Sequence, residues 1–196
     1  MHGKLIPVLL FVTYVSFAAD PSQYIGEESR AIKSLSAQEV DSLRRGDGMG
    51  FAKLAELNHY PGPKHVLDVS DELELSPTQI VETEFLFEQM QSNAVALGEE
   101  LIAAESRLGQ DFADKSVTPQ TLEAALLKIG NLRARLRYVH LEAHLRQAQL
   151  LSADQIARYD SLRGYQDAAQ DHSHHAGSHN WQFSLSKPGS RVKSRT

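Results

Sequence analysis

Two of the nine histidines, His140 and His144, stand four positions apart in the sequence HLEAH. Side chains four apart lie on one face of a helix, so both imidazoles can converge on one metal ion. Glu142 lies two positions after His140, about 200° around a helix, whereas a zinc-protease motif has glutamate directly after the first histidine. The pair therefore predicts a metal site without a peptidase base. The alternative is that both are solvated or capped polar residues beside Arg137 and Arg146.

Further ligands would have to complete this site, because two imidazoles rarely hold zinc alone. His59 and His65 flank the turn YPGP and are the natural candidates. We expect zinc, copper(II) or nickel, since neutral imidazole suits all three ions. The chain has three methionines, one of them the initiator, so a methionine-rich Cu(I) site is not expected.

A second group of histidines lies in the sequence DHSHHAGSHN near the C-terminus, where no apolar period is visible. Its members are His172, His174, His175 and His179. We expect residues 166–196 to form a disordered tail, and flexible histidine clusters bind Cu(II), Ni(II) or Zn(II) with moderate affinity. The alternative for this segment is a tail that only increases solubility.

Composition excludes several other kinds of chemistry. The chain has no cysteine, which excludes disulfides, thiolate metal sites and a cysteine nucleophile. Its net charge of −5 argues against a general nucleic-acid binder, which needs a basic surface. No Ser-His-Asp arrangement, phosphate-binding loop or pair of carboxylates stands out, so we do not expect an enzyme.

The N-terminus resembles a secretory signal. One basic residue, Lys4, precedes an apolar run over residues 5–17, and Ser16 and Ala18 fit a signal-peptidase site with cleavage before Ala19. The run is shorter than the roughly 20 residues that a helix needs to cross a bilayer. We expect residues 1–18 to be a cleaved signal peptide; an uncleaved membrane anchor is the alternative.

Three similar phrases, LSPTQ, LSADQ and LSAQE, indicate where helices begin. In the first, Ser76 can cap the helix, Pro77 falls at the first helical position, and Gln79 can reach back to the cap backbone. The other two phrases repeat this spacing with the pairs Ser152–Gln155 and Ser36–Glu39. Thr118 and Pro119 predict a related helix start that lacks the reciprocal partner.

Two long segments between these starts carry apolar residues every three or four positions, as in helices packed lengthwise. The first set is Ile80, Phe87, Met90, Ala94, Leu97, Leu101, Ala104, Leu108 and Phe112. The second set is Leu122, Leu126, Ile129, Leu132, Leu136, Val139, Ala143 and Leu150. The short connection DKSVTP implies an antiparallel hairpin over residues 77–150. We therefore predict an all-α fold, with short helices in VLDVSDEL and LSADQIARYDSLRGY.

A hairpin of two helices cannot bury a full core. The second long helix also carries an apolar row away from its main seam: Tyr138, Leu141, Leu145 and Ala148. Either the short flanking helices cover this row or a second chain does. We favour a homodimer, because a thin helical hairpin alone exposes too much apolar surface.

Two copies of L-[TS]-x-x-Q, each opening a helix in a cysteine-free chain with a signal sequence, resemble the Spy/CpxP family, which is named for its LTxxQ motif. This family includes periplasmic heavy-metal sensor and resistance proteins of the CnrX and ZraP type. The resemblance covers residues 64–165. It implies a periplasmic, often dimeric helical hairpin, either an ATP-independent chaperone or a metal-binding protein, and it supports His140 and His144 as ligands.

The remaining segments define the domain organisation. Residues 19–63 are expected to form a helical arm, in which the glycines and prolines of GDGMGFAKLAELNHYPGPKH suggest a fixed conformation without indicating its role. The hairpin domain then spans residues 64–165. Within it, the sequence RARLR is either a solvated face that pairs with the acidic segment GEELIAAES or a basic surface that attracts unfolded clients.

Two functions from different classes remain. The histidine excess favours a periplasmic stress or heavy-metal-resistance protein that senses or buffers divalent transition-metal ions. The alternative is an ATP-independent chaperone that holds unfolded envelope proteins. A membrane sensor partner is compatible with the first function, and no nucleic-acid partner is expected.

Overall fold

The computed structural model describes residues 22–165, and over this range the chain is helical without any strand. The signal peptide expected at residues 1–18 and the tail expected at residues 166–196 lie outside the described residues. None of the helices in the described range is long and apolar enough to cross a membrane.

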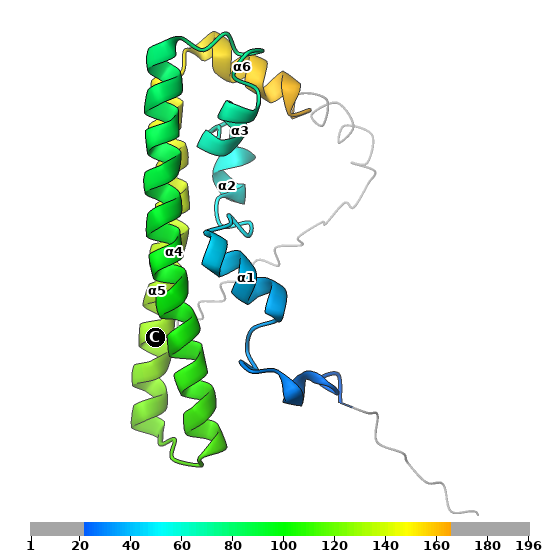
Figure 1. The fold of residues 1–196 in the computed structure, drawn as a ribbon, viewed down its shortest axis with the longest axis vertical. Coiled ribbons are helices and arrows are strands. Elements are labelled where there is room, and N and C mark those ends of the chain that lie inside the picture. Colours follow the sequence, from blue (N-terminus) through cyan, green and yellow to red (C-terminus); the bar gives the residue numbers. More distant parts are fainter. Residues whose placement is uncertain (1–21, 166–196) are drawn as a thin grey trace, which may run out of the picture.

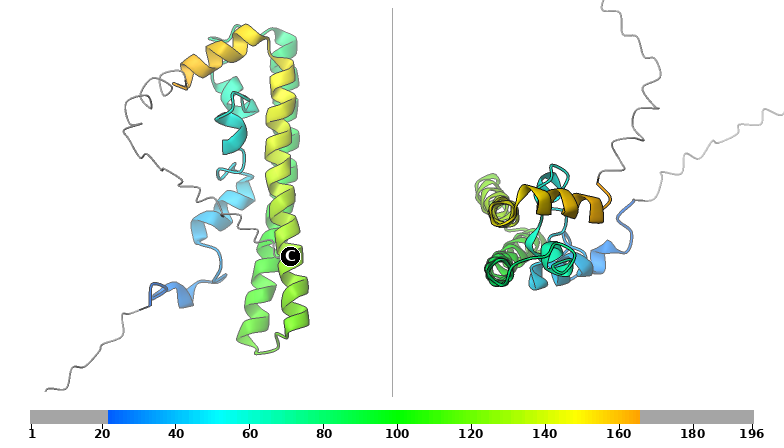
Figure 2. Two further views of the ribbon diagram at one scale, coloured as in Figure 1. Left: turned by 180° about the vertical axis from the view of Figure 1, so that it is seen from behind. Right: turned by 90° about the horizontal axis from the view of Figure 1, so that it is seen from above.

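Two long helices, α4 (Pro77–Ala113) and α5 (Pro119–Leu150), form the predicted antiparallel hairpin. They lie side by side along their length (Figures 1 and 2). With 37 residues, α4 is the longer of the two, and at about 1.5 Å per residue it extends roughly 55 Å. The all-α class and the hairpin are therefore confirmed.

The helix starts agree with the predicted capping. Ser76 accepts a hydrogen bond from the Gln79 backbone N–H at 3.2 Å, and Gln79 Oε1 accepts one from the Ser76 N–H at 3.0 Å. The same reciprocal box is present at Ser36 and at Ser152. The expectation for Thr118 was wrong, because Thr121 Oγ1 accepts from the Thr118 N–H at 2.9 Å and completes a box there too. A threonine hydroxyl thus provides the reciprocal hydrogen bond of the capping box, for which we considered only glutamate or glutamine.

The glutamines of the two repeated phrases also pair with each other. Gln79 Nε2 donates to Gln155 Oε1 at 2.9 Å, and Gln155 Nε2 donates to Gln79 Oε1 at 3.2 Å. Gln79 Nε2 also donates to the Leu150 carbonyl at 2.8 Å, at the end of α5. The repeat therefore joins the start of α4 to the start of α6 (Ala153–Leu162), in addition to capping each helix.

Short elements run along one side of the hairpin (Figure 1). They are the 3-10 turn η1 (Glu27–Ser29), α1 (Ala37–Arg45), α2 (Lys53–Glu56) and α3 (Pro63–Asp68). Helix α6 crosses the end of the hairpin (Figure 2). The helix expected in VLDVSDEL begins earlier, at Pro63, because proline fits the first helical turn. It ends at Asp68, before turns that include the left-handed Glu74 (φ 51°).

Two apolar clusters hold these elements together. The larger one joins α1, α4 and α5 through residues that include Leu43, Leu97, Leu101 and Leu136. The smaller one contains Val66, Leu73, Leu151 and Tyr159, with Leu75 packed against it. The leucines that open LSPTQ and LSADQ therefore pack in one cluster, at the end of the hairpin that α6 crosses, whereas Leu35 of LSAQE lies in the larger cluster.

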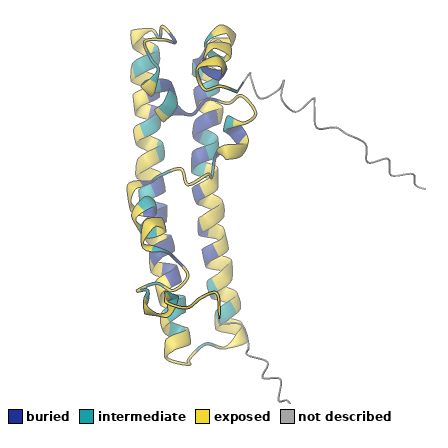
Figure 3. Ribbon diagram, turned by 90° about the vertical axis from the view of Figure 1, so that its right-hand side faces the viewer, coloured by how far each residue is buried: buried dark blue, intermediate teal, exposed yellow. Residues whose placement is uncertain are grey.

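The opposite end of the hairpin is largely exposed (Figure 3). Phe112 and Leu126, both predicted seam residues, are 55% and 52% exposed, so the seam prediction was wrong at the tip. The apolar residues keep their helical spacing at the tip, but no third element of the described residues packs against the two helices there. In the second row of α5, Tyr138 and Leu145 are also exposed, at 62% and 51%, so the short helices do not cover them.

Candidate metal centre

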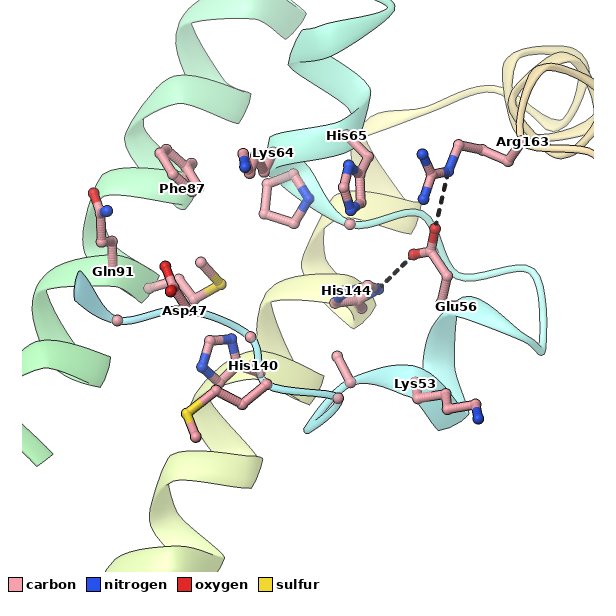
Figure 4. A pocket seen from close by; sticks show the side chains of 18 residues that line it. Asp47, Lys53, Glu56, Lys64, His65, Phe87, Gln91, His140, His144 and Arg163 are labelled. Carbon is pink, nitrogen blue, oxygen red and sulfur yellow. Dashed lines mark ion pairs between the residues drawn. The ribbon is translucent and has the colours of Figure 1, made fainter. Parts of the chain in front are cut away.

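A cavity of about 560 Å³ lies between the hairpin and the loop that follows α1. Both His140 and His144 line it from α5 (Figure 4). They are 2% and 9% exposed. The two histidines are therefore not solvated, because the loop over residues 46–50 and the turn over residues 60–63 cover this face of α5. The other form of the alternative, capped polar residues, agrees with the hydrogen bond between His144 and the Tyr60 carbonyl.

The ring of His144 has a defined orientation. Its Nδ1 lies 2.7 Å from the carbonyl oxygen of Tyr60, which can only accept a hydrogen bond, so Nδ1 carries the proton. In the neutral imidazole this leaves Nε2 unprotonated, with a lone pair available to a metal ion. A hydrogen bond from the distal nitrogen is the usual way in which proteins orient a metal-ligating histidine.

Gly62 lies so close to this nitrogen that a side chain would not fit there. A Cβ atom built on Gly62 would lie 2.8 Å from His144 Cε1 and 2.9 Å from His144 Nε2. Real Cβ atoms essentially never come this close to another heavy atom. The turn from Tyr60 to Gly62 thus contacts the imidazole in two places, through the Tyr60 carbonyl at Nδ1 and through the close backbone of Gly62 beside Cε1 and Nε2.

His140 is the more deeply buried of the two histidines. Its Nε2 is buried and has no hydrogen-bond partner among the described residues. The ring stacks on Phe51 at a centroid distance of 5.6 Å. Burial lowers the pKa of His140, and repulsion from His144 lowers it further. A neutral, unpartnered imidazole nitrogen at a cavity wall is available to bind a metal ion. With neither an ion nor a hydrogen-bond partner, its burial costs free energy.

Glu56 is the carboxylate nearest to His144, with its Oε2 3.6 Å from Nδ1. Its Oε1 accepts hydrogen bonds from Tyr159 at 2.6 Å and from Tyr165 at 2.9 Å. Arg163 lies 3.5 Å from the same oxygen. Burial raises the pKa of Tyr159, and its hydrogen bond to Glu56 raises it further. Glu56 therefore links the histidine face of α5 to α6.

The other predicted ligands differ in whether they lie at the cavity. His65 lines the same cavity, and its Nδ1 lies 3.3 Å from Asp68. His59 does not line the cavity. Its side chain is largely exposed, and its Nδ1 lies 2.8 Å from Asp160 Oδ2. His172, His174, His175 and His179 lie outside the described residues. Within residues 22–165 there is no group of three His, Cys, Asp or Glu side chains arranged to hold a metal ion.

Sequence reasoning missed several residues that shape the cavity. Glu56, the Tyr60 carbonyl and Gly62 all come from the arm whose role the sequence did not indicate, and so does Met49. The cluster of glycine and proline was the available signal, since such residues commonly lie where the backbone approaches another group closely. Backbone carbonyl contacts leave no mark in the sequence.

Arg133 settles the interpretation of one member of RARLR. Its guanidinium donates to Glu105 Oε1 at 2.8 Å, and Glu105 belongs to the acidic segment GEELIAAES. This agrees with the expectation of pairing between the two long helices.

Comparisons of the chain with protein-family models, with curated proteins and with solved structures found no match.

Proposed function

We propose that the protein binds a transition-metal ion of the zinc, nickel and copper group through His140 and His144, as a sensor or buffer exported to the periplasm. One observation carries the proposal. Two histidines on one face of α5 line the same cavity, one with Nε2 buried and unpartnered and the other with Nε2 left free by its bond to Tyr60. A pair of available imidazole nitrogens in one cavity is the beginning of a metal site.

The missing ligands have two sources in this proposal. His65 and Glu56 line the cavity and can turn toward an ion, and water can occupy any remaining position. Binding requires neutral imidazoles, and the lowered pKa of His140 keeps its ring neutral at the pH values where the site would operate.

The test is isothermal titration of zinc, nickel and copper(II) into a tail-serine protein, which is the chain from residue 19 to 196 with four substitutions: His172→Ser, His174→Ser, His175→Ser and His179→Ser. This protein should bind one ion at pH 7.5. His140→Ala and His144→Ala should each weaken binding at least tenfold, or about 1.4 kcal/mol.

Two glycines provide a matched pair of further variants. Gly62→Ala should weaken binding because the new methyl group displaces the His144 ring. Gly48→Ala should not, because Gly48 lines the same cavity and a Cβ there meets nothing within 4 Å. Circular dichroism would confirm that each variant folds. If the tail-serine protein binds no ion, the core site does not exist.

A holding chaperone is the second candidate, and exposed apolar surface at the hairpin tip favours it. Leu126 and Leu127 are 52% and 69% exposed and border a shallow groove of about 670 Å³. Exposed apolar patches of this kind mark sites for protein partners. Absence of a core metal site in the titration would make this the first candidate.

We also propose a homodimer that covers the exposed apolar residues of α5, such as Tyr138 and Leu145. Analytical ultracentrifugation tests it: a dimeric mass is expected, and a monomer at micromolar concentration would refute it.

A further inference from the structure

The two methionines that follow the N-terminal segment, Met49 and Met90, both line the cavity that contains His140 and His144. Met49 comes from the loop after α1, and Met90 comes from α4. The chain has three methionines in all, and the third is Met1. Two elements distant in sequence thus bring both thioethers to the wall that carries the two imidazoles.

Packing does not account for either methionine. Neither one belongs to the two apolar clusters of the described residues or to the side chains packed against them. Met49 is 41% exposed, and its backbone has a positive φ of 43°, a conformation that costs energy for a residue with a side chain. Strained residues of this kind concentrate at ligand sites.

The carboxylates of the cavity are engaged except at Glu56 Oε2, which is buried without a hydrogen-bond partner among the described residues. Glu56 accepts from Tyr159 and Tyr165, and Asp47 pairs with Arg45 at 2.6 Å. That pairing lowers the pKa of Asp47. The described residues contain no group of three His, Cys, Asp or Glu side chains arranged to hold a metal ion. Beside the imidazoles, Glu56 Oε2 is therefore the carboxylate oxygen at hand, and the rest of a donor set has to come from other kinds of side chain.

The fixed charges around the cavity also bear on which ion it can hold. Three cationic side chains, Lys53, Lys64 and Arg163, line it, against the two anionic side chains Asp47 and Glu56. A site made of neutral imidazoles and thioethers adds no compensating negative charge. Such surroundings favour an ion of single positive charge over a divalent one, because the Coulomb repulsion is halved.

We infer that this cavity is a copper site that takes Cu(I), with His140, His144, Met49 and Met90 as its donor set. Thioether sulfur is a soft ligand that selects Cu(I), and imidazole binds copper well. The inference rests on the proposed function, since it requires that His140 and His144 bind metal. It departs from the expectation from composition that a chain with three methionines has no methionine-rich Cu(I) site, because the fold brings two of them to the cavity that the two histidines line.

The absence of cysteine gives this inference a direct spectroscopic test. In the tail-serine protein, which begins at residue 19, the sulfur atoms are those of Met49 and Met90 alone. X-ray absorption of the anaerobic Cu(I) complex should therefore show copper–sulfur scattering. That scattering should disappear in the double variant Met49→Leu, Met90→Leu. Leucine is a near-isosteric replacement for methionine and should preserve the fold, which circular dichroism checks.

Affinity measured by competition with a Cu(I) chelator provides the second readout. The double leucine variant should bind Cu(I) at least tenfold more weakly than the tail-serine protein, while its affinity for zinc changes less than threefold. His144→Ala should weaken the binding of both ions.

The outcomes separate this inference from the proposed function. If Cu(I) binds with nitrogen and oxygen scattering alone, or if the leucine variant binds Cu(I) as tightly as its parent, the copper assignment is wrong. In that case the histidine site still stands, provided that zinc binding depends on His144. If the tail-serine protein binds neither Cu(I) nor zinc, both proposals fail.

Discussion

The two ends of the helical hairpin differ in what covers them. The cavity end comprises the start of α4, the end of α5, the helices α2, α3 and α6 and the loop over residues 46–50. There the short elements cover the buried His140 and His144. At the hairpin tip, residues 109–130, the same two helices expose Phe112, Leu126 and Leu127 (Figure 3). Helical periodicity continues through both ends, so the difference arises from the covering elements.

This contrast shows where specificity resides in the molecule. The tip buries few side chains, Ile129 among them, so we expect it to tolerate most substitutions. The cavity end depends on close approaches between segments far apart in sequence, such as the contact of Tyr60 with His144. Substitutions of the same kind should therefore have different consequences at the two ends.

The largest difference is expected between two glycines of α4, one under the covering helix α1 and one at the uncovered tip. A Cβ at Gly98 would lie 2.5 Å from the Leu43 carbonyl oxygen, so Gly98→Ala must displace α1. We expect it to lower the free energy of unfolding by about 2 kcal/mol, as overpacking does elsewhere. Gly109, near the tip, has nothing within 4 Å of its Cβ position. Gly109→Ala should stabilise the protein by about 1 kcal/mol through helix propensity.

Urea unfolding followed by circular dichroism measures both changes. If the two alanine variants have equal stability, α1 does not pack against α4 as described.

A smaller difference is expected between two helix caps. Gln79 closes the box at Ser76 and also bonds to Leu150 and Gln155, so Gln79→Ala should cost about 2 kcal/mol. Thr121 closes the box of α5, and its side chain bonds to no described residue other than Thr118, so Thr121→Ala should cost about 1 kcal/mol or less. Equal losses in urea unfolding would mean that the glutamine pair contributes nothing beyond capping.

The pattern of the sequence accounts for the hairpin but only in part for the cavity. The helix starts at Ser76 and Ser152 depend on local hydrogen bonding, so they could be predicted directly from the sequence. The burial of His140 could not, because it depends on the loop over residues 46–50, which has no periodic pattern. Phe112 and Leu126 were wrongly predicted to be buried in the seam for the same reason. The apolar periodicity identifies one face of a helix, but not whether another element covers that face.

The third prediction concerns pH and the metal-free protein. Burial lowers the pKa of His140 in the folded state, whereas in the unfolded chain it should be about 6.5. As the pH falls below that value, the unfolded chain takes up a proton that the folded chain does not. The contribution of His140 to stability is therefore present above this pH and is lost as the pH falls toward the folded pKa. For one proton the slope cannot exceed about 1.4 kcal/mol per pH unit.

His140→Phe preserves an aromatic ring for Phe51 to stack on and removes the titrating group. In a chelating buffer, its stability should depend less on pH between 7 and 5 than that of the parent protein. Identical pH dependence in the two proteins would contradict the burial of His140 as a neutral ring.

The central claim is that His140 and His144 present free ring nitrogens to a metal ion, and NMR of histidine ring nitrogens tests it most directly. In the metal-free tail-serine protein at pH 7.5, His144 should carry its proton on Nδ1, as its contact with Tyr60 requires. One equivalent of zinc should then shift the Nε2 signals of both His140 and His144. A proton on Nε2 of His144, or ring signals of both histidines that do not change with zinc, would contradict the account.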